Sequence, residues 1–140
     1  MASYDLYNSV EVKKALAIGA ISSNTTTYSD WIDLSGTYGV FFDILSGSIT
    51  DGTYVPVIQE SDLDDHSDAA NVDPNFLLGT YDYATFVAAD DNVAKKLGYV
   101  GKKRYVRIGY VSSGVTTGGT LSASAVLGIP RHAPTDPGVR

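Results

Sequence analysis

The residues most able to bind a partner gather in a basic segment of the chain. Six of the ten Lys and Arg residues fall within 95–107, although the formal net charge is -6. In "KKRYVRIGY" the alternation predicts a strand with Lys103, Tyr105 and Arg107 on one face and Arg104 turned towards the other. Such a face suits a protein interface or single-stranded nucleic acid, or it is a solvated sheet surface. The acidic total disfavours nucleic acid, because phosphate binding needs a positive face.

An acidic segment, "SDLDDHSDAANVD", offers hard oxygen ligands of the kind that calcium prefers. The candidate metal ligands are Asp62, Asp64 and Asp65, with Asp68 and Asp73 further along the segment. Their spacing does not match the EF-hand loop, which needs a Gly at its sixth position and a Glu at its twelfth. We therefore expect a solvated loop without a metal ion, and no cofactor.

The remaining residue types give little support to catalysis. The chain has no Cys, which excludes disulfides, thiolate chemistry and Cys-ligated zinc. Its two histidines, His66 and His132, lie far apart in the sequence and are interpreted as surface residues. The Ser-Gly and Gly-Gly pairs resemble hairpin turns more than a strained nucleophile turn or a phosphate loop. We expect that the protein is not an enzyme.

Alternation of apolar and polar residues at a period of two recurs along the chain and is typical of half-buried strands. It is clearest in "YGVFFDILSG", "KRYVRIGYVS" and "GTLSASAVLG", which are rich in β-branched and aromatic residues. One face of each run should be buried, and the predicted core is Phe42, Ile44, Val106, Ile108, Leu121, Ala123 and Leu127.

Turn residues separate these runs. The pair Asp51-Gly52 in "TDGT" predicts a tight hairpin, and "SSGVTTGGT" predicts a longer turn between the last two strands. Pro56 lacks the N–H that a central strand must donate, so its strand should be an edge or carry a bulge. Helix should stay under about 15% of the chain, with one helical turn at most in the loop over 85–92.

These features predict an all-β fold, an antiparallel β-sandwich of jelly-roll-like or barrel-like form with extended terminal arms. Residues 1–20 would form an N-terminal arm or first strand, residues 21–129 the sandwich, and residues 130–140 a Pro-rich tail. The start of the chain has no basic stretch before its apolar part, so we expect no secretory signal peptide and synthesis in the host cytoplasm.

The phrases "DLSGTYGV", "GSITDGTYVPVIQESD", "GKKRYVRI" and "LGIPRHAP" follow one another in this order. Together they resemble a family of small structural proteins encoded in the head-gene region of tailed bacteriophages and prophages. The resemblance covers nearly the whole chain, from about Tyr4 to Pro134, and is weakest in "DPNFLLGTYDYATFVAADDN". It carries over no catalytic residue.

The resemblance implies a capsid decoration, or cement, protein that binds the outer surface of the phage head and stabilises the shell. The expected partners are the major capsid protein and further copies of this chain, with no nucleic acid and no membrane. The alternative is a carbohydrate-binding or host-attachment module of a spike or tail. The expected interface residues are Tyr4, Tyr7, Lys103, Tyr105, Arg107, Arg131 and His132.

Overall fold

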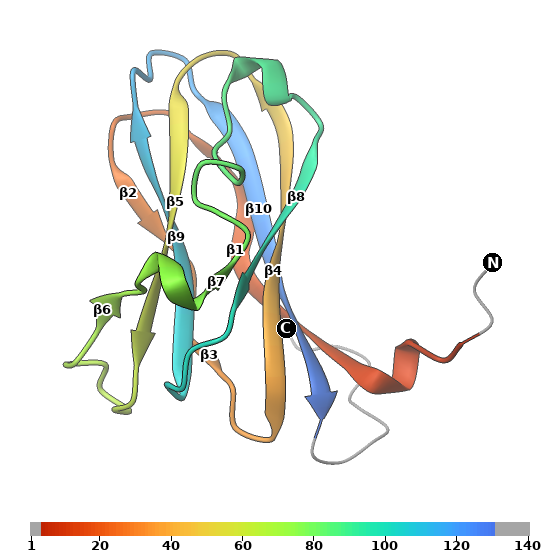
Figure 1. Ribbon diagram of the computed structural model, residues 1–140. Coiled ribbons are helices and arrows are strands. Elements are labelled where there is room, and N and C mark those ends of the chain that lie inside the picture. The colour runs from red at the N-terminus through yellow and green to blue at the C-terminus, as the bar shows by residue number, and fades with distance from the viewer. Residues whose placement is uncertain (1–3, 131–140) are drawn as a thin grey trace.

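The computed structural model describes residues 4–130, which form two antiparallel sheets packed face to face (Figure 1). Sheet A has the strand order β1-β10-β4-β8-β7, and sheet B has the order β2-β9-β5-β6, with β3 also paired to β9. The predicted all-β sandwich is confirmed. The strands are β1 (Val10–Ile21), β2 (Thr26–Tyr28), β3 (Ile32–Asp33), β4 (Thr37–Ile49), β5 (Thr53–Ser61), β6 (Ala70–Asn71), β7 (Leu77–Leu78), β8 (Ala94–Tyr99), β9 (Tyr105–Ser113) and β10 (Gly119–Pro130).

Helical structure in the described residues is limited to three short 3-10 turns. These are η1 (Tyr7–Ser9), η2 (Pro74–Phe76) and η3 (Ala88–Asp90). The last falls within the loop over 85–92, where the sequence allowed one helical turn. The segment "VEVKKALAIGAI", whose residues suit a strand as well as a helical turn, forms β1 and pairs along its length with β10.

The core lies between the two sheets and is built from alternate residues of each strand. On β4, Phe42 and Ile44 are fully buried while their neighbours Phe41, Asp43 and Leu45 are exposed. The prediction from alternation is confirmed, since all seven predicted core residues are buried: Phe42, Ile44, Val106, Ile108, Leu121, Ala123 and Leu127.

The turn at Asp51 and Gly52 is not a hairpin, because β4 belongs to sheet A and β5 to sheet B. The chain crosses here from one sheet to the other, and Gly52 supplies the positive φ of 94° that the bend requires. The Asp51 carboxylate accepts hydrogen bonds from the N–H groups of Thr116, Thr117 and Gly118, at 2.9–3.1 Å. Asp51 therefore ties together the two crossings, 50–52 and 114–118, at one end of the sandwich.

The strand of Pro56 is neither an edge nor bulged, because β5 lies between β9 and β6 and its register with β9 is unbroken at Pro56. However, β6 pairs only with Gln59 and Glu60, so at Pro56 the side of β5 away from β9 has no neighbouring strand. The backbone groups of Tyr54 and Ile58 point away from β9, since they bond to Phe86, Val72 and the Tyr81 hydroxyl. Pro56 lies two residues from each of them, so its backbone points the same way, and the N–H that it lacks would have pointed away from β9.

The segment between β6 and β8 closes this open side of the sandwich. Phe86 is fully buried, forms a bridge to Tyr54 and packs edge to face on Tyr110 with ring centroids 6.1 Å apart. The Tyr110 hydroxyl donates a 3.1 Å hydrogen bond to the Ala84 carbonyl. Burial raises the pKa of Tyr110 well above its ordinary value. The segment that resembles the phage family least therefore supplies part of the core.

Replacing Ile108 by Ala should destabilise the fold by about 2–5 kcal/mol, because it opens a cavity at a fully buried site. The matched control is Val111→Ala on the same strand, whose side chain is 44% exposed on the other face and should cost under about 1 kcal/mol. Urea unfolding measures both values, and equal losses would contradict the assigned strand face.

Candidate functional site

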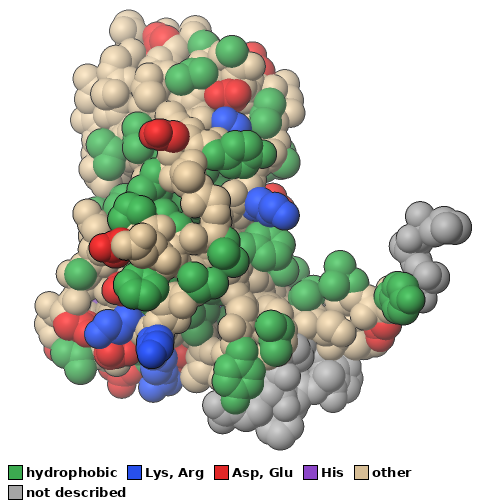
Figure 2. Space-filling model, in the orientation of Figure 1, with side chains coloured by type: hydrophobic (Ala, Val, Ile, Leu, Met, Phe, Trp, Pro, Cys, Tyr) green, Lys and Arg blue, Asp and Glu red, His purple; other side chains and the backbone are tan. Residues whose placement is uncertain are grey.

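One end of the sandwich, called here the terminal end, carries most of the charged residues of both sequence segments. It comprises the arm over residues 4–9, the loops over 34–38, 61–69 and 100–104, and the end of β10. Figure 2 shows Lys and Arg side chains beside Asp and Glu side chains at the lower left of the molecule. The two charge blocks therefore meet within one chain.

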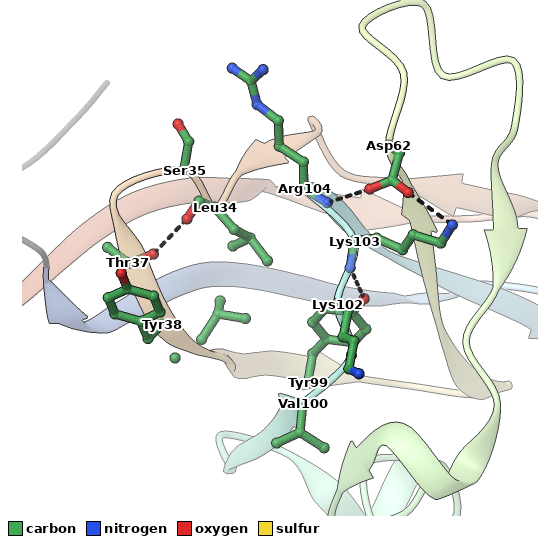
Figure 3. A pocket seen from close by; sticks show the side chains of 13 residues that line it. Leu34, Ser35, Thr37, Tyr38, Asp62, Tyr99, Val100, Lys102, Lys103 and Arg104 are labelled. Atoms are coloured by element: carbon green, nitrogen blue, oxygen red, sulfur yellow. Dashed lines mark hydrogen bonds and ion pairs between the residues drawn. The ribbon is translucent and has the colours of Figure 1, made fainter.

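Acidic partners from the same chain pair with two of the cations just before β9, Lys103 and Arg104. Lys103 forms a 2.9 Å ion pair with Asp62, and the Arg104 backbone N–H donates to the same carboxylate at 3.2 Å (Figure 3). The Arg104 guanidinium binds both oxygens of Asp33, at 3.1 and 3.0 Å. This bidentate pair lowers the pKa of Asp33 to about 2.

The alternation predicted that Arg104 turns to the opposite face from Tyr105. In the structure it does not. Its guanidinium lies 4.9 Å from the centre of the Tyr105 ring, and Asp33 stands opposite Tyr105 in the β3–β9 register. The prediction was wrong because β9 begins at Tyr105. Residues before that point do not follow the strand alternation.

The strand residue Arg107 lies within a series of stacked side chains, called here the aromatic column. Its guanidinium carbon lies 3.9 Å from the centre of the Tyr28 ring and 4.7 Å from that of Trp31. Trp31 stacks on His66 with centroids 4.3 Å apart, and His66 meets Tyr105 edge to face at 4.9 Å. The column therefore joins β2, the β2–β3 connection and the acidic loop to β9.

Two further contacts fix the column on the outer face of sheet B. The Oε1 atom of Gln59, opposite Arg107 on β5, accepts hydrogen bonds from Arg107 Nε at 2.9 Å and Nη2 at 2.7 Å. Gly109 leaves room for Tyr28, since a Cβ there would lie 2.5 Å from the Tyr28 ring. A side chain at position 109 would push this ring off the strand.

The carboxylates of the acidic loop are occupied within the chain. Asp64 accepts a hydrogen bond from the Tyr105 hydroxyl, and Asp65 accepts one from the Ser67 N–H at 3.0 Å. Asp68 binds the Ser61 hydroxyl and the Asp62 N–H. Across residues 4–130, no group of three or more His, Cys, Asp or Glu side chains is placed to hold a metal ion.

A pocket of about 510 Å³ opens between the loops over 34–38 and 100–104 (Figure 3). Leu34, Tyr38 and Val100 give it apolar walls, and Lys102 adds a cation. The Tyr99 hydroxyl donates a 2.6 Å hydrogen bond to Glu60 and accepts one from the Lys103 N–H. Burial and the Glu60 carboxylate raise the pKa of Tyr99, so its hydroxyl stays neutral and positions the loop.

Further exposed apolar side chains of the terminal end lie on the N-terminal arm, β4 and β10. Tyr4 is 94% exposed and Tyr7 68%, and Figure 2 shows the arm projecting from the body with hydrophobic side chains on it. Tyr38 is 71% exposed, and Ile129 packs beside Gly39. Arg131 and His132, also expected at the interface, lie outside the described residues.

The sequence residues expected at the interface thus separate into two sets. Tyr4, Tyr7 and Lys103 lie at the terminal end, whereas Tyr105 and Arg107 belong to the aromatic column. Sequence reasoning missed the column's other members, Tyr28, Trp31 and His66, which lie far from β9 along the chain. A Gly at position 109 within a strand was the available signal, because it marks close approach of another group.

The solved structures that are similar to this chain include XepA and YomS. XepA, an exported protein of PBSX, is 18% identical with a TM-score of 0.54, and the match covers 98% of this chain but 41% of XepA. YomS, an SPBc2 prophage-derived protein, is 13% identical with a TM-score of 0.46, over 84% of this chain and 93% of YomS. The likeness to XepA shows a shared fold, and this chain spans less than half of XepA's length.

No known protein family matches the sequence, and no curated protein matches it. In the described part of the chain, no helix has the length and apolar character needed to span a membrane.

Replacing Arg104 by Gln should lower stability at pH 7 and have less effect at pH 3. The pKa of Asp33 is about 2 in the folded protein against an ordinary value of 3.8. The pair therefore stabilises the fold fully above about pH 4, and that contribution is lost as pH falls through 2. Urea unfolding at the two pH values measures the change. A difference between wild type and variant that does not shrink at pH 3 would contradict this role of Asp33.

Replacing Arg107 by Ala should shift the fluorescence of Trp31 to longer wavelength, because the indole loses its guanidinium neighbour. The chain has one Trp, so its emission reports on the aromatic column alone. The fold should lose about 1–2 kcal/mol through two cation–π contacts and the Gln59 hydrogen bonds. Ser48→Ala, an exposed change on β4, is the control, and unchanged emission in Arg107→Ala would exclude the column.

Proposed function

We propose that this chain is a structural protein of a bacteriophage particle that decorates the head. In this role it binds the outer surface of the major capsid protein shell through its terminal end and stabilises the shell by bridging neighbouring capsid subunits. The observation that carries the proposal is the concentration of exposed apolar side chains at that end: Tyr4, Leu6, Tyr7, Tyr38, Val100 and Ile129.

Exposed apolar side chains gathered at one end of the molecule, where a pocket also opens, favour a protein partner. Tyr supplies large apolar area with a polar tip, and interface anchors are enriched in this residue. A standard interface buries about 800 Å² on each partner, roughly a tenth of the 7944 Å² surface of this chain.

Phage origin is supported from two directions. The sequence phrases resemble small proteins of the phage head-gene region, and the fold is similar to that of XepA, which is named as a protein of PBSX. The name of XepA describes it as exported, so a location outside the particle is the outcome that the experiment must separate from head decoration.

The alternative of a carbohydrate-binding module is less favoured by the aromatic column. Sugar-binding sites present free ring faces, whereas Trp31 here is stacked on His66 and contacts Arg107. Tyr28 lies against Gly109 and Arg107. These contacts use the ring surfaces that would stack on a sugar or on a nucleic-acid base.

The direct test is the amount of this protein in purified particles of the phage whose genome encodes it. Decoration of a symmetric shell requires on the order of hundreds of copies per particle. A spike or tail component would be present in tens of copies or fewer. Recovery of the protein only in the particle-free medium would overturn the proposal.

Removing residues 1–9 together with Tyr38→Ser should reduce binding to shells that lack the protein by roughly tenfold or more, because interface anchors are lost. The body should remain folded, since residues 4–9 precede β1 and the Tyr38 side chain is 71% exposed. Co-sedimentation measures occupancy, and circular dichroism checks the fold. The control is Tyr83→Ser, which removes a 61% exposed Tyr next to Lys95 rather than at the terminal end. Equal occupancy for both variants would exclude the terminal end.

A further inference from the structure

The outer face of sheet A carries a cross-strand pattern that the proposed attachment to the shell does not use. Three exposed residues of β4 face outward, and each stands opposite a residue of β8 in the antiparallel register. The pairs are Phe41 with Gly98, Asp43 with Lys96, and Leu45 with Ala94. Large or acidic residues on one strand thus lie beside small or basic residues on the next.

Asp43 and Lys96 are exposed, and neither has an ion-pair partner within residues 4–130. They differ in this respect from the cations Lys103 and Arg104 at the terminal end, which bind Asp62 and Asp33. A sheet face with one free acid and one free base at the same level is self-complementary in charge.

An apolar row crosses the same face from edge to edge. In register, Val12 of β1 stands opposite Val126 of β10, Val126 opposite Phe41, and Phe41 opposite Gly98. The side chain of Leu78, on β7, covers Gly98. Val12, Phe41 and Leu78 are exposed by 42%, 38% and 58%. Isolated exposed apolar residues are ordinary, but a continuous row marks an interaction surface.

We infer that the outer face of sheet A is a two-fold interface with a second copy of this chain. With the two-fold axis running along the strands between β4 and β8, β4 of one copy lies over β8 of the other. Each Asp43 then faces Lys96 of the second copy, each Phe41 meets its Gly98 and Leu78, and each Leu45 meets its Ala94. Such an isologous contact forms every pair twice.

The face has the dimensions that a stable dimer needs. Strands of 12 and 13 residues, as in β10 and β4, are about 40 Å long, and four strands are about 19 Å across. That is enough for the roughly 800 Å² per partner of a standard interface. Face-to-face sheets pack about 10 Å apart, a gap that a Lys and an Asp side chain span together. The outer face of sheet B is partly covered by the aromatic column. It also lacks the cross-strand pattern of large or acidic residues opposite small or basic residues.

Sedimentation analysis of the purified full chain, without phage particles, tests the inference. The wild type should form dimers. Asp43→Lys should be monomeric because it places Lys against Lys, and Lys96→Asp because it places Asp against Asp. An equimolar mixture of these two variants should form heterodimers, and the double exchange in one chain should dimerise again. Both changes are at exposed positions, so thermal unfolding should show folded variants.

Phe41→Arg provides a second measurement, with Val111→Arg on the outer face of sheet B as its control. Loss of a central anchor should raise the dimer dissociation constant by at least roughly 30-fold, equivalent to about 2 kcal/mol. The control should leave it unchanged. A monomeric wild type at high concentration, or single charge variants that dimerise as the wild type does, would overturn the inference. Neither result depends on whether the protein binds a phage head.

Discussion

The burial of two apolar sheet faces against each other is the constraint on which the rest of the structure depends. Phe42 and Ile44 of sheet A and Val106 and Ile108 of sheet B are fully buried between the sheets. Because side chains alternate along a strand, burying these positions commits every intervening residue to the outside. On β4 the committed residues include an apolar side chain, Phe41, that a solvated face does not need. The core thus also determines which side chains are available for contacts with other molecules.

The meeting of the two charged segments follows from the register of one strand pair. Ser61, the last residue of β5, stands opposite Tyr105, the first residue of β9. The residues just beyond these ends, Asp62 and Arg104, must therefore approach each other, although 42 positions separate them. Lys103 and Arg104 are therefore paired with carboxylates of the same chain. The pairing of these two cations is a consequence of β-sheet register, which residue types alone do not show.

The sequence allowed prediction of whatever depends on local pattern. Alternation identified the sandwich and the core. Pro56 suggested an edge strand or a bulge, whereas β5 is an inner strand whose second neighbour, β6, is too short to reach Pro56. The sequence could not show that Asp51 and Gly52 connect strands of different sheets, because turn residues determine the bend but not the sheet that the next strand enters. Nor could it show the aromatic column, since Trp31 and His66 become neighbours only through tertiary packing. The interface residues expected on β9 were chosen by residue type, and residue type does not reveal an intramolecular partner.

The geometry of a sandwich separates its faces from its ends, and this allows two kinds of contact at once. The outer face of sheet A is parallel to its strands, whereas the terminal end is the surface at which the strands end (Figure 1). The two surfaces are therefore roughly perpendicular. A dimer formed through the face would leave both terminal ends free, with both pointing the same way because the two-fold axis follows the strands. Two weak attachments held in one particle raise each other's effective concentration. Self-association through the face would therefore strengthen attachment through the ends without any additional contact to the shell.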